Sequence, residues 1–355
     1  MVNKYMKIGI VTPYEEANYG AYLQAYATKI FLENEGHDVF FVKWRSEYVR
    51  KKAFYINSTN MKAFIKKLIH YKHNHKNYIS MTESLKEFKT INMKDINDAK
   101  LDCIILGSDE IWNITMKIFQ KEVFFGGGFN ETPILAYAPS AGNATISDFE
   151  GYNNIINLVN NVNVIGVRDE NTRNLINDMR SYSTEIVCDP TLLICSKDYM
   201  VKKNTSIKDK YILIYAYYVS PEMRDNLILF AKEKGIKTVS ACMYQSWCDI
   251  NIACEPLEFI SLIQNAEYVF TTTFHGSIFT FMNHKKCAIQ VPSKKLLDLI
   301  KWTGMDSAII DSQDYEKLNY TLNQEYDYEK FEENISKRRE KSAKLYREAL
   351  SALKI

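Results

Sequence analysis

Residues 7–42 read KIGIVTPYEEANYGAYLQAYATKIFLENEGHDVFFV, and this stretch decides the fold class. Residues 7–12 and 39–42 are short apolar runs typical of buried strands, and residues 18–36 between them place apolar side chains at helical spacing. Asn18 can cap the start of this helix. A strand, a helix and a second strand in this order predict a parallel, doubly wound α/β sheet. The first turn has no G-x-G-x-x-G, so the sequence predicts no dinucleotide cofactor.

A second set of strand and helix patterns follows a polar stretch at residues 196–209. Its apolar runs predict strands at residues 211–217, 236–241, 267–272 and 286–291. We therefore expect two Rossmann-like domains that face a central cleft, followed by a charged helix. The predicted boundaries are residues 1–198, 209–326 and 327–355.

Composition excludes several classes of protein. With 46% hydrophobic and 25% charged residues, the 355-residue chain resembles an ordinary globular protein. Its formal net charge of +2 gives no general affinity for nucleic acid. No apolar run approaches the length of about 20 residues that a membrane-spanning helix needs. Seven scattered cysteines without a C-x-x-C pair predict reduced thiols, no metal site and a cytoplasmic location.

The strand-to-helix corner in EYVFTTTFHGSIFTF, residues 267–281, holds the first candidate site residue, His275. Ligands bind at the carboxyl ends of strands in open α/β sheets, and a helix start directs unpaired N–H groups to the same place. Gly276 would let a ligand approach the backbone. A structural histidine with no role in binding is the alternative interpretation.

Polar residues also follow three predicted strands of the first half. Asn18, Tyr19 and Gly20 lie after the first strand, where an ordinary helix cap is an equal alternative. The loop GSDEIWN, residues 107–113, combines carboxylates and an amide with an aromatic ring, as sugar sites do. Arg168 directly follows a strand and could bind a carboxylate or a phosphate, or pair with a neighbouring carboxylate on the surface.

The segment from residue 50 to residue 89 is unusually basic. Within it, residues 61–78 place apolar side chains among lysines at helical spacing, as in helices that lie on anionic membranes. A helix that packs on its own domain with a solvated basic face is the commoner case.

In this order, the motifs make the chain resemble the polysaccharide pyruvyl transferase family. The motifs are NYGAYLQAYA at 18–27, GSDEIWN at 107–113, AYAPSAG at 136–142, VRDENT at 167–172, CDPTLL at 188–193 and TTTFHGSIF at 271–279. The resemblance implies a two-domain fold similar to GT-B glycosyltransferases. It also implies transfer of the enolpyruvyl group of phosphoenolpyruvate onto a sugar, with formation of a pyruvate ketal and phosphate.

Carried over by position, His275 matches the family's functional histidine and Arg168 matches an arginine implicated in donor binding. Two positions differ, since Thr273 and Lys295 stand where many members have arginine. The expected donor-binding residues are Arg168, Thr273, Phe274, Gly276, Ser277 and Lys295. The expected acceptor-binding residues are Asn18, Tyr19, Gly20, Glu110, Trp112 and Asn113. The first domain would then be the acceptor side and the second the donor side.

Ketal formation needs a proton at the methylene carbon of the donor and a base for the attacking hydroxyl. His275 is the expected acid, because histidine alone titrates near neutrality without perturbation. Asp109 is the first candidate base and Glu110 the second. Expected partners are phosphoenolpyruvate and a glycan or lipid-linked saccharide, with peripheral contact at the inner membrane face as a further prediction. The alternatives are a glycosyltransferase that uses a nucleotide-sugar donor and a catalytically silent glycan-binding protein.

Overall fold

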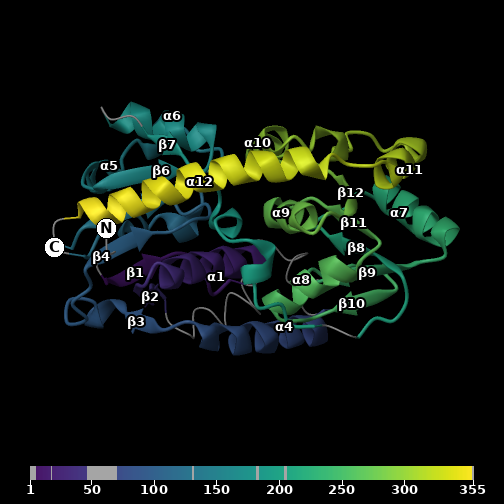
Figure 1. Cartoon of the computed structure of the whole chain (residues 1–355), viewed down its shortest axis with the longest axis horizontal. Coiled ribbons are helices and arrows are strands. Elements are labelled where there is room, and N and C mark those ends of the chain that lie inside the picture. The colour runs from purple at the N-terminus through teal and green to yellow at the C-terminus, as the bar shows by residue number, and fades with distance from the viewer. Residues whose placement is uncertain are drawn as a thin grey trace.

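A computed structural model describes residues 5–16, 18–45, 70–129, 132–180, 184–203 and 206–353. Two separate parallel sheets form its framework (Figure 1). The first has the strand order β3-β2-β1-β4-β5-β6-β7. Its strands are β1 (Lys7–Val11), β2 (Asp38–Lys43), β3 (Thr90–Asn92), β4 (Cys103–Leu106), β5 (Ile134–Tyr137), β6 (Val164–Val167) and β7 (Glu185–Ile186).

The second sheet repeats the same winding with the order β10-β9-β8-β11-β12. Its strands are β8 (Tyr211–Tyr215), β9 (Lys237–Ala241), β10 (Ile250–Ile252), β11 (Tyr268–Thr271) and β12 (Lys286–Ile289). Central strands such as β4 and β8 are buried along their whole length because helices cover both faces. The predicted fold class, two Rossmann-like α/β units with a C-terminal helix, is confirmed.

Helices follow most strands and cover the sheets. In the first half these are α1 (Tyr19–Asn34), α4 (Tyr71–Ser84), α5 (Asn153–Asn160) and α6 (Glu170–Met179). In the second half they are α7 (Pro221–Lys234), α8 (Pro256–Asn265), α9 (Phe274–Met282), α10 (Lys294–Thr303) and α11 (Tyr315–Asn323). Asn18 caps α1 by accepting a hydrogen bond from the Gly20 amide, as the sequence predicts.

The start of α1 packs against the second sheet. The Tyr19 ring stacks on Tyr215 at the end of β8, with ring centroids 6.3 Å apart. Its hydroxyl donates a hydrogen bond of 2.7 Å to the backbone oxygen of Cys254. This contact brings the carboxyl edges of the two sheets together at the start of α1.

The C-terminal helix α12 (Tyr328–Ala352) extends along both halves of the molecule (Figure 1). Near its start, Phe331 packs on Phe281 of α9. Near its end, Tyr346 stacks on Tyr137 of β5 at a centroid distance of 4.3 Å. The helix therefore joins the two halves through buried aromatic contacts.

The structure tests the two sequence predictions about membranes only for the residues that it describes. Of the basic segment at residues 61–78, only residues 70–78 fall within the described chain, where they belong to α4 and the turn before it. The rest of that prediction lies outside the described residues. Within the part that is described, no helix has the length and apolar character to cross a membrane.

Candidate functional site

Three charged or polar side chains from three loops meet between the two halves. Arg168 directly follows β6, Asp189 follows β7, and His275 lies in the first turn of α9. Arg168 Nη1 donates a hydrogen bond of 2.9 Å to Asp189 Oδ2. His275 Nε2 lies 3.5 Å from the same oxygen. Asp189 thus links an arginine of one domain to a histidine of the other.

Local structure explains why Asp189 faces both partners. Its other oxygen, Oδ1, accepts hydrogen bonds from the Thr191 amide (3.0 Å) and hydroxyl (2.7 Å), which cap a short helix beginning at Pro190. This arrangement leaves Oδ2 for Arg168 and His275. Burial raises the pKa of Asp189, but His275, Arg168 and Thr191 lower it more, so its pKa lies well below the usual range. The carboxylate is therefore charged at neutral pH.

Arg168 keeps part of its hydrogen-bonding capacity unused. Its side chain is buried, yet within the described residues neither Nε nor Nη2 has a hydrogen-bond partner. The guanidinium lies over the Phe274 ring, 4.7 Å from the centroid. Burial lowers the pKa of Arg168, but Asp189, Asp109 and Asp169 together raise it further. A charged group with two free donors is thus held in a fixed position.

Asp109 follows β4 and lies beside Arg168 Nη2, one of the two donors without a hydrogen-bond partner. Its Oδ1 is 3.9 Å from Arg168 Nη2 and accepts a hydrogen bond of 2.9 Å from the Glu110 amide. The backbone φ of Asp109 is +76°, a left-handed conformation that few residues other than glycine adopt. Such conformations often occur at functional sites because the surroundings must hold them.

Glu110 forms an ion pair that crosses between the halves. It bonds Lys295 of α10, and its other oxygen accepts a hydrogen bond of 2.9 Å from Asn113. Burial raises the pKa of Glu110, but Lys295 and Asn113 lower it more. The predicted acceptor residues Glu110 and Asn113 therefore lie beside Lys295, a predicted donor residue.

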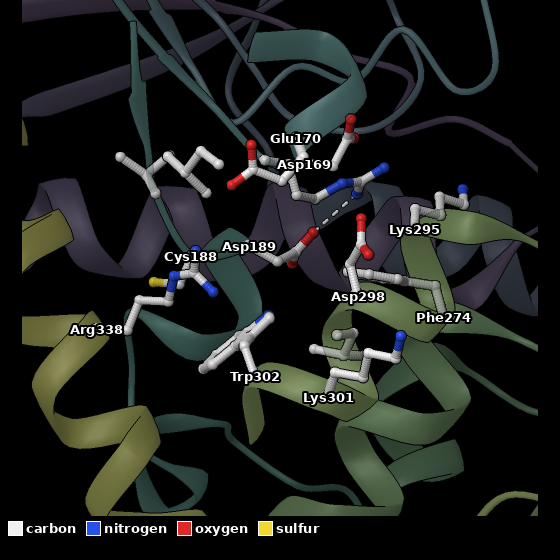
Figure 2. Close-up of a pocket in the computed structure, with 14 residues that line it drawn as sticks. Asp169, Glu170, Cys188, Asp189, Phe274, Lys295, Asp298, Lys301, Trp302 and Arg338 are labelled. Atoms are coloured by element: carbon white, nitrogen blue, oxygen red, sulfur yellow. Dashed lines mark hydrogen bonds and ion pairs between the residues drawn. The ribbon is translucent and has the colours of Figure 1, made fainter. Parts of the chain in front are cut away.

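A cavity of about 350 Å³ adjoins these residues (Figure 2). Arg168, Asp189 and Asp169 line it from the first domain, and Phe274, Lys295 and Trp302 from the second. Arg338 of α12 completes the lining. The cavity is large enough for a small metabolite and carries charges of both signs.

The turn before α9 differs from the prediction of an open anion-binding helix start. Thr273 caps α9, and its hydroxyl accepts the hydrogen bond of the Gly276 amide at 3.1 Å. Thr271, Thr273 and Tyr215 fill the space beside Gly276, so a ligand cannot approach there. Ser277 is fully buried and donates to the Thr273 carbonyl at 2.9 Å. The predicted donor contacts of Gly276 and Ser277 are therefore wrong, because the turn uses these groups itself.

Two predicted acceptor residues are also corrected. The Trp112 ring is 0% exposed and its Nε1 donates to the Phe124 carbonyl at 2.9 Å, so no ring face is available to a sugar. Tyr19 is buried against Tyr215 and Cys254. Gly20 has a different role, since a side chain at this position would collide with the His275 ring. The small residue lets the two domains meet at the histidine.

Asp189 is not among the site residues that the sequence predicts. The residue lies within CDPTLL, one of the motifs that carry the family resemblance, and that motif was the available signal. Spacing alone could not reveal it, because its partners Arg168 and His275 come from distant parts of the chain. Among the described residues, no group of three metal-ligating side chains comes together.

Solved structures with the same architecture are nucleotide-sugar and sugar-phosphate enzymes. UDP-GlcNAc 2-epimerase from Neisseria meningitidis, bound to UDP-GlcNAc, matches with a TM-score of 0.53 and 12% identity over 98% of this chain and 100% of its own. Trehalose-6-phosphate synthase matches with a TM-score of 0.53 and 10% identity over 98% and 99% of the two chains. At these identities the similarity establishes the GT-B fold alone.

The sequence comparisons are more specific. No curated protein matches the chain. The model of the polysaccharide pyruvyl transferase family matches residues 18–289, well over half of the chain. That range includes Arg168, Asp189 and His275, which the structure brings together. The chain is therefore a transferase that belongs to the polysaccharide pyruvyl transferase family.

Proposed function

We propose that this protein transfers the enolpyruvyl group of phosphoenolpyruvate to a sugar of a cell-surface glycan or its precursor. The observation that carries this proposal is the free edge of Arg168. Nε and Nη2 present their N–H groups side by side in the guanidinium plane, where they match two oxygens of a carboxylate or phosphate. Both atoms are buried and lack hydrogen-bond partners within the described chain, and Asp109 Oδ1 lies 3.9 Å from Nη2. Phosphoenolpyruvate carries both kinds of anion.

The groups around Arg168 support an anionic donor. The guanidinium of Arg168 lies over the Phe274 ring, and both residues line the cavity. Lys295 lines the same cavity and adds positive charge, although Glu110 already pairs with it. Asp189 fixes the opposite side of the guanidinium through Nη1. The free edge is therefore oriented before the donor arrives, which reduces the entropy lost on binding.

We assign the proton donor to His275, which lies beside Asp189, and the base to Asp109, which lies beside Arg168. His275 gives a proton to the methylene carbon, which becomes a methyl group and leaves an oxocarbenium-like centre at the neighbouring carbon. Two sugar hydroxyls form bonds to that carbon and release two protons, one of which Asp109 accepts. The bond from that carbon to the phosphate oxygen breaks, and inorganic phosphate leaves with the second proton. His275 Nε2 has no hydrogen bond in the described chain and lies 3.5 Å from Asp189 Oδ2, so we assign Asp189 the role of orienting the imidazole through electrostatic attraction.

Two other functions compete with this proposal. The GT-B fold is shared with enzymes that bind nucleotide sugars, so a nucleotide-sugar donor is the second candidate. A silent glycan-binding protein is the third, because Thr273 replaces an arginine that many family members have and its hydroxyl caps α9 instead. Both alternatives predict that phosphoenolpyruvate is not consumed.

Incubation with phosphoenolpyruvate and a mixture of saccharides tests the proposal. Phosphorus NMR should show phosphoenolpyruvate converted to inorganic phosphate, and mass spectrometry should show a saccharide that has gained a pyruvate ketal. His275→Asn serves as the control for contaminating phosphatase. Consumption of a nucleotide sugar in place of phosphoenolpyruvate would support the second candidate.

We also propose that the acceptor is presented at the inner membrane face on a lipid carrier. The support is the basic composition of residues 61–78, since each cation near an anionic bilayer adds about 1 kcal/mol of attraction. Co-sedimentation with anionic vesicles should be lost when Lys62, Lys66, Lys67 and Lys72 are all replaced by Glu. Equal sedimentation of both proteins would refute this contact.

A further inference from the structure

The cavity beside Arg168 has a second end that neither the family motifs nor the predicted site residues explain. In Figure 2, Phe274 and Lys295 lie to one side of Asp189, while Arg338 and Trp302 lie to the other. The Arg338 guanidinium lies over the Trp302 ring, 4.4 Å from the centroid. Arg338 falls outside the matched residues 18–289. The family resemblance therefore assigns no role to Arg338, although it lines the same cavity as Arg168.

Arg338 lacks the partners that an arginine at a packing contact usually has. Within the described residues it makes no hydrogen bond, and no carboxylate lies within 4.0 Å of it. Burial lowers its pKa, and Glu170 and Asp298 oppose this only from a distance. Lys301, which also lines the cavity, has no ion-pair partner in the described chain either. Two cations thus face the cavity without a carboxylate of their own.

The first end of the cavity can hold only one of the two anionic groups of the donor. Arg168 has a single free edge, since Asp189 occupies Nη1. Thr273 brings no charge and is used as a helix cap. Lys295 is already paired with Glu110. A second anionic group therefore needs a cation from elsewhere in the cavity.

We propose that Arg338 binds the second anionic group of the donor and so replaces the arginine that is missing at Thr273. This inference rests on phosphoenolpyruvate being the donor. Trp302 holds the guanidinium flat against the cavity wall through the cation–π contact, which leaves its edges open to a carboxylate or phosphate. Lys301 adds a further positive charge to the cavity, on the Phe274 side of Asp189 in Figure 2.

The cavity is also lined by four carboxylates that oppose an anion, those of Asp169, Glu170, Asp189 and Asp298. Asp298 lines it, between the two ends in Figure 2. Burial, Asp169 and Glu170 raise the pKa of Asp298, whereas Lys301 and Arg338 lower it less. The cations that line the cavity, Arg168, Lys295, Lys301 and Arg338, offset these carboxylates.

Calorimetric titration with phosphoenolpyruvate tests the role of Arg338. Arg338→Gln should weaken binding about 10- to 100-fold, the usual effect of losing a charge-assisted hydrogen bond. Arg338→Lys should recover part of the affinity because it keeps the charge but not the planar fork. Arg347→Gln is the matched control, since Arg347 lies on the same helix and near the Phe31 ring, but pairs with Glu35.

The outcomes separate this inference from the proposed function. Unchanged affinity in Arg338→Gln, with a lower melting temperature, would assign Arg338 to α10–α12 packing alone and overturn the inference. Equal weakening by Arg347→Gln would also overturn it, because the effect would belong to the helix and not to the cavity. If the wild-type protein does not bind phosphoenolpyruvate, both the proposed function and this inference are wrong.

Discussion

On the first-domain side of the cleft, Arg168 keeps two buried donors without partners in the described chain, whereas on the second-domain side the turn before α9 satisfies itself. Both sides are strand ends of parallel sheets, where ligands are expected. We propose from this difference that Arg168 in the first half binds one anionic group of the donor and that the turn before α9 holds His275 in place. The motif TTTFHGSIF therefore identifies a site, although most of its residues only position the side chain of His275.

Replacing His275 should have the largest effect on the reaction. His275→Asn removes the imidazole while it preserves a polar side chain at the contact with Asp189. Phosphate release should fall about 100- to 10,000-fold, the usual contribution of a general acid, with donor affinity largely kept. Steady-state kinetics and a donor titration measure the two quantities separately. A near-normal rate would show that the second domain contributes structure only.

Asp189 joins the two sides, so its loss should reduce stability most. Asp189→Asn leaves the buried Arg168 guanidinium without its closest carboxylate, and breaking a buried ion pair typically costs about 3–5 kcal/mol. Urea denaturation at pH 7 measures this cost. Asp225→Asn, at an exposed pair with Arg224, should change stability little.

The pH dependence of stability gives a second test of Asp189. Its pKa is lower in the folded protein than the unfolded value of about 3.9. The carboxylate therefore contributes its full stability above about pH 4, and this contribution is lost as the pH falls through the folded-state pKa. Denaturation curves between pH 5 and pH 2.5 should fall more steeply for the wild type than for Asp189→Asn. Parallel curves would contradict the account.

Arg168→Lys tests whether the Nε and Nη2 groups of Arg168 bind the donor, without removing the positive charge. Lysine keeps the charge near Asp189 but lacks the planar edge that Nε and Nη2 provide. The dissociation constant for phosphoenolpyruvate should rise about 10- to 100-fold, as expected for losing a charge-assisted hydrogen bond. Turnover at saturating donor should change less, because the interaction is present before and during the chemical step. Equal affinity of both proteins would show that the free edge has no ligand.

Thr273→Ala should have the smallest effect and sharpen the contrast. The change removes the cap of α9, which typically costs about 1 kcal/mol of stability. Because Thr273 is used within the turn, donor affinity should stay within about 2-fold, a difference below 0.5 kcal/mol. A large loss of affinity for phosphoenolpyruvate, with little change in melting temperature, would instead show that the turn before α9 contacts the donor.

The sequence predicts regular elements better than contacts between them. Apolar runs such as those of β1 and β8 identify buried parallel strands, and Asn18 caps a helix as expected. The three-residue strands β3 and β10 were not predicted, because they lie at sheet edges and are only partly buried.

The candidate site shows the same limit. Arg168 is recognisable because it directly follows a strand, and His275 because it lies at a strand-to-helix corner, each within a motif. Asp189 is not, because its contacts depend on how two domains pack. The direction of Trp112 depends on the path of its loop, which turns the ring into the core. Composition alone could not distinguish that arrangement from a sugar platform.

Calorimetric titration of the wild-type protein with phosphoenolpyruvate and with UDP-N-acetylglucosamine tests the central claim most directly. We predict saturable binding of phosphoenolpyruvate, and about 2.7 kcal/mol of added stability at 100 times its dissociation constant. UDP-N-acetylglucosamine should bind weakly, since the proposal assigns the charged cavity to the smaller anion. Tight binding of the nucleotide sugar, with no response to phosphoenolpyruvate, would contradict the account.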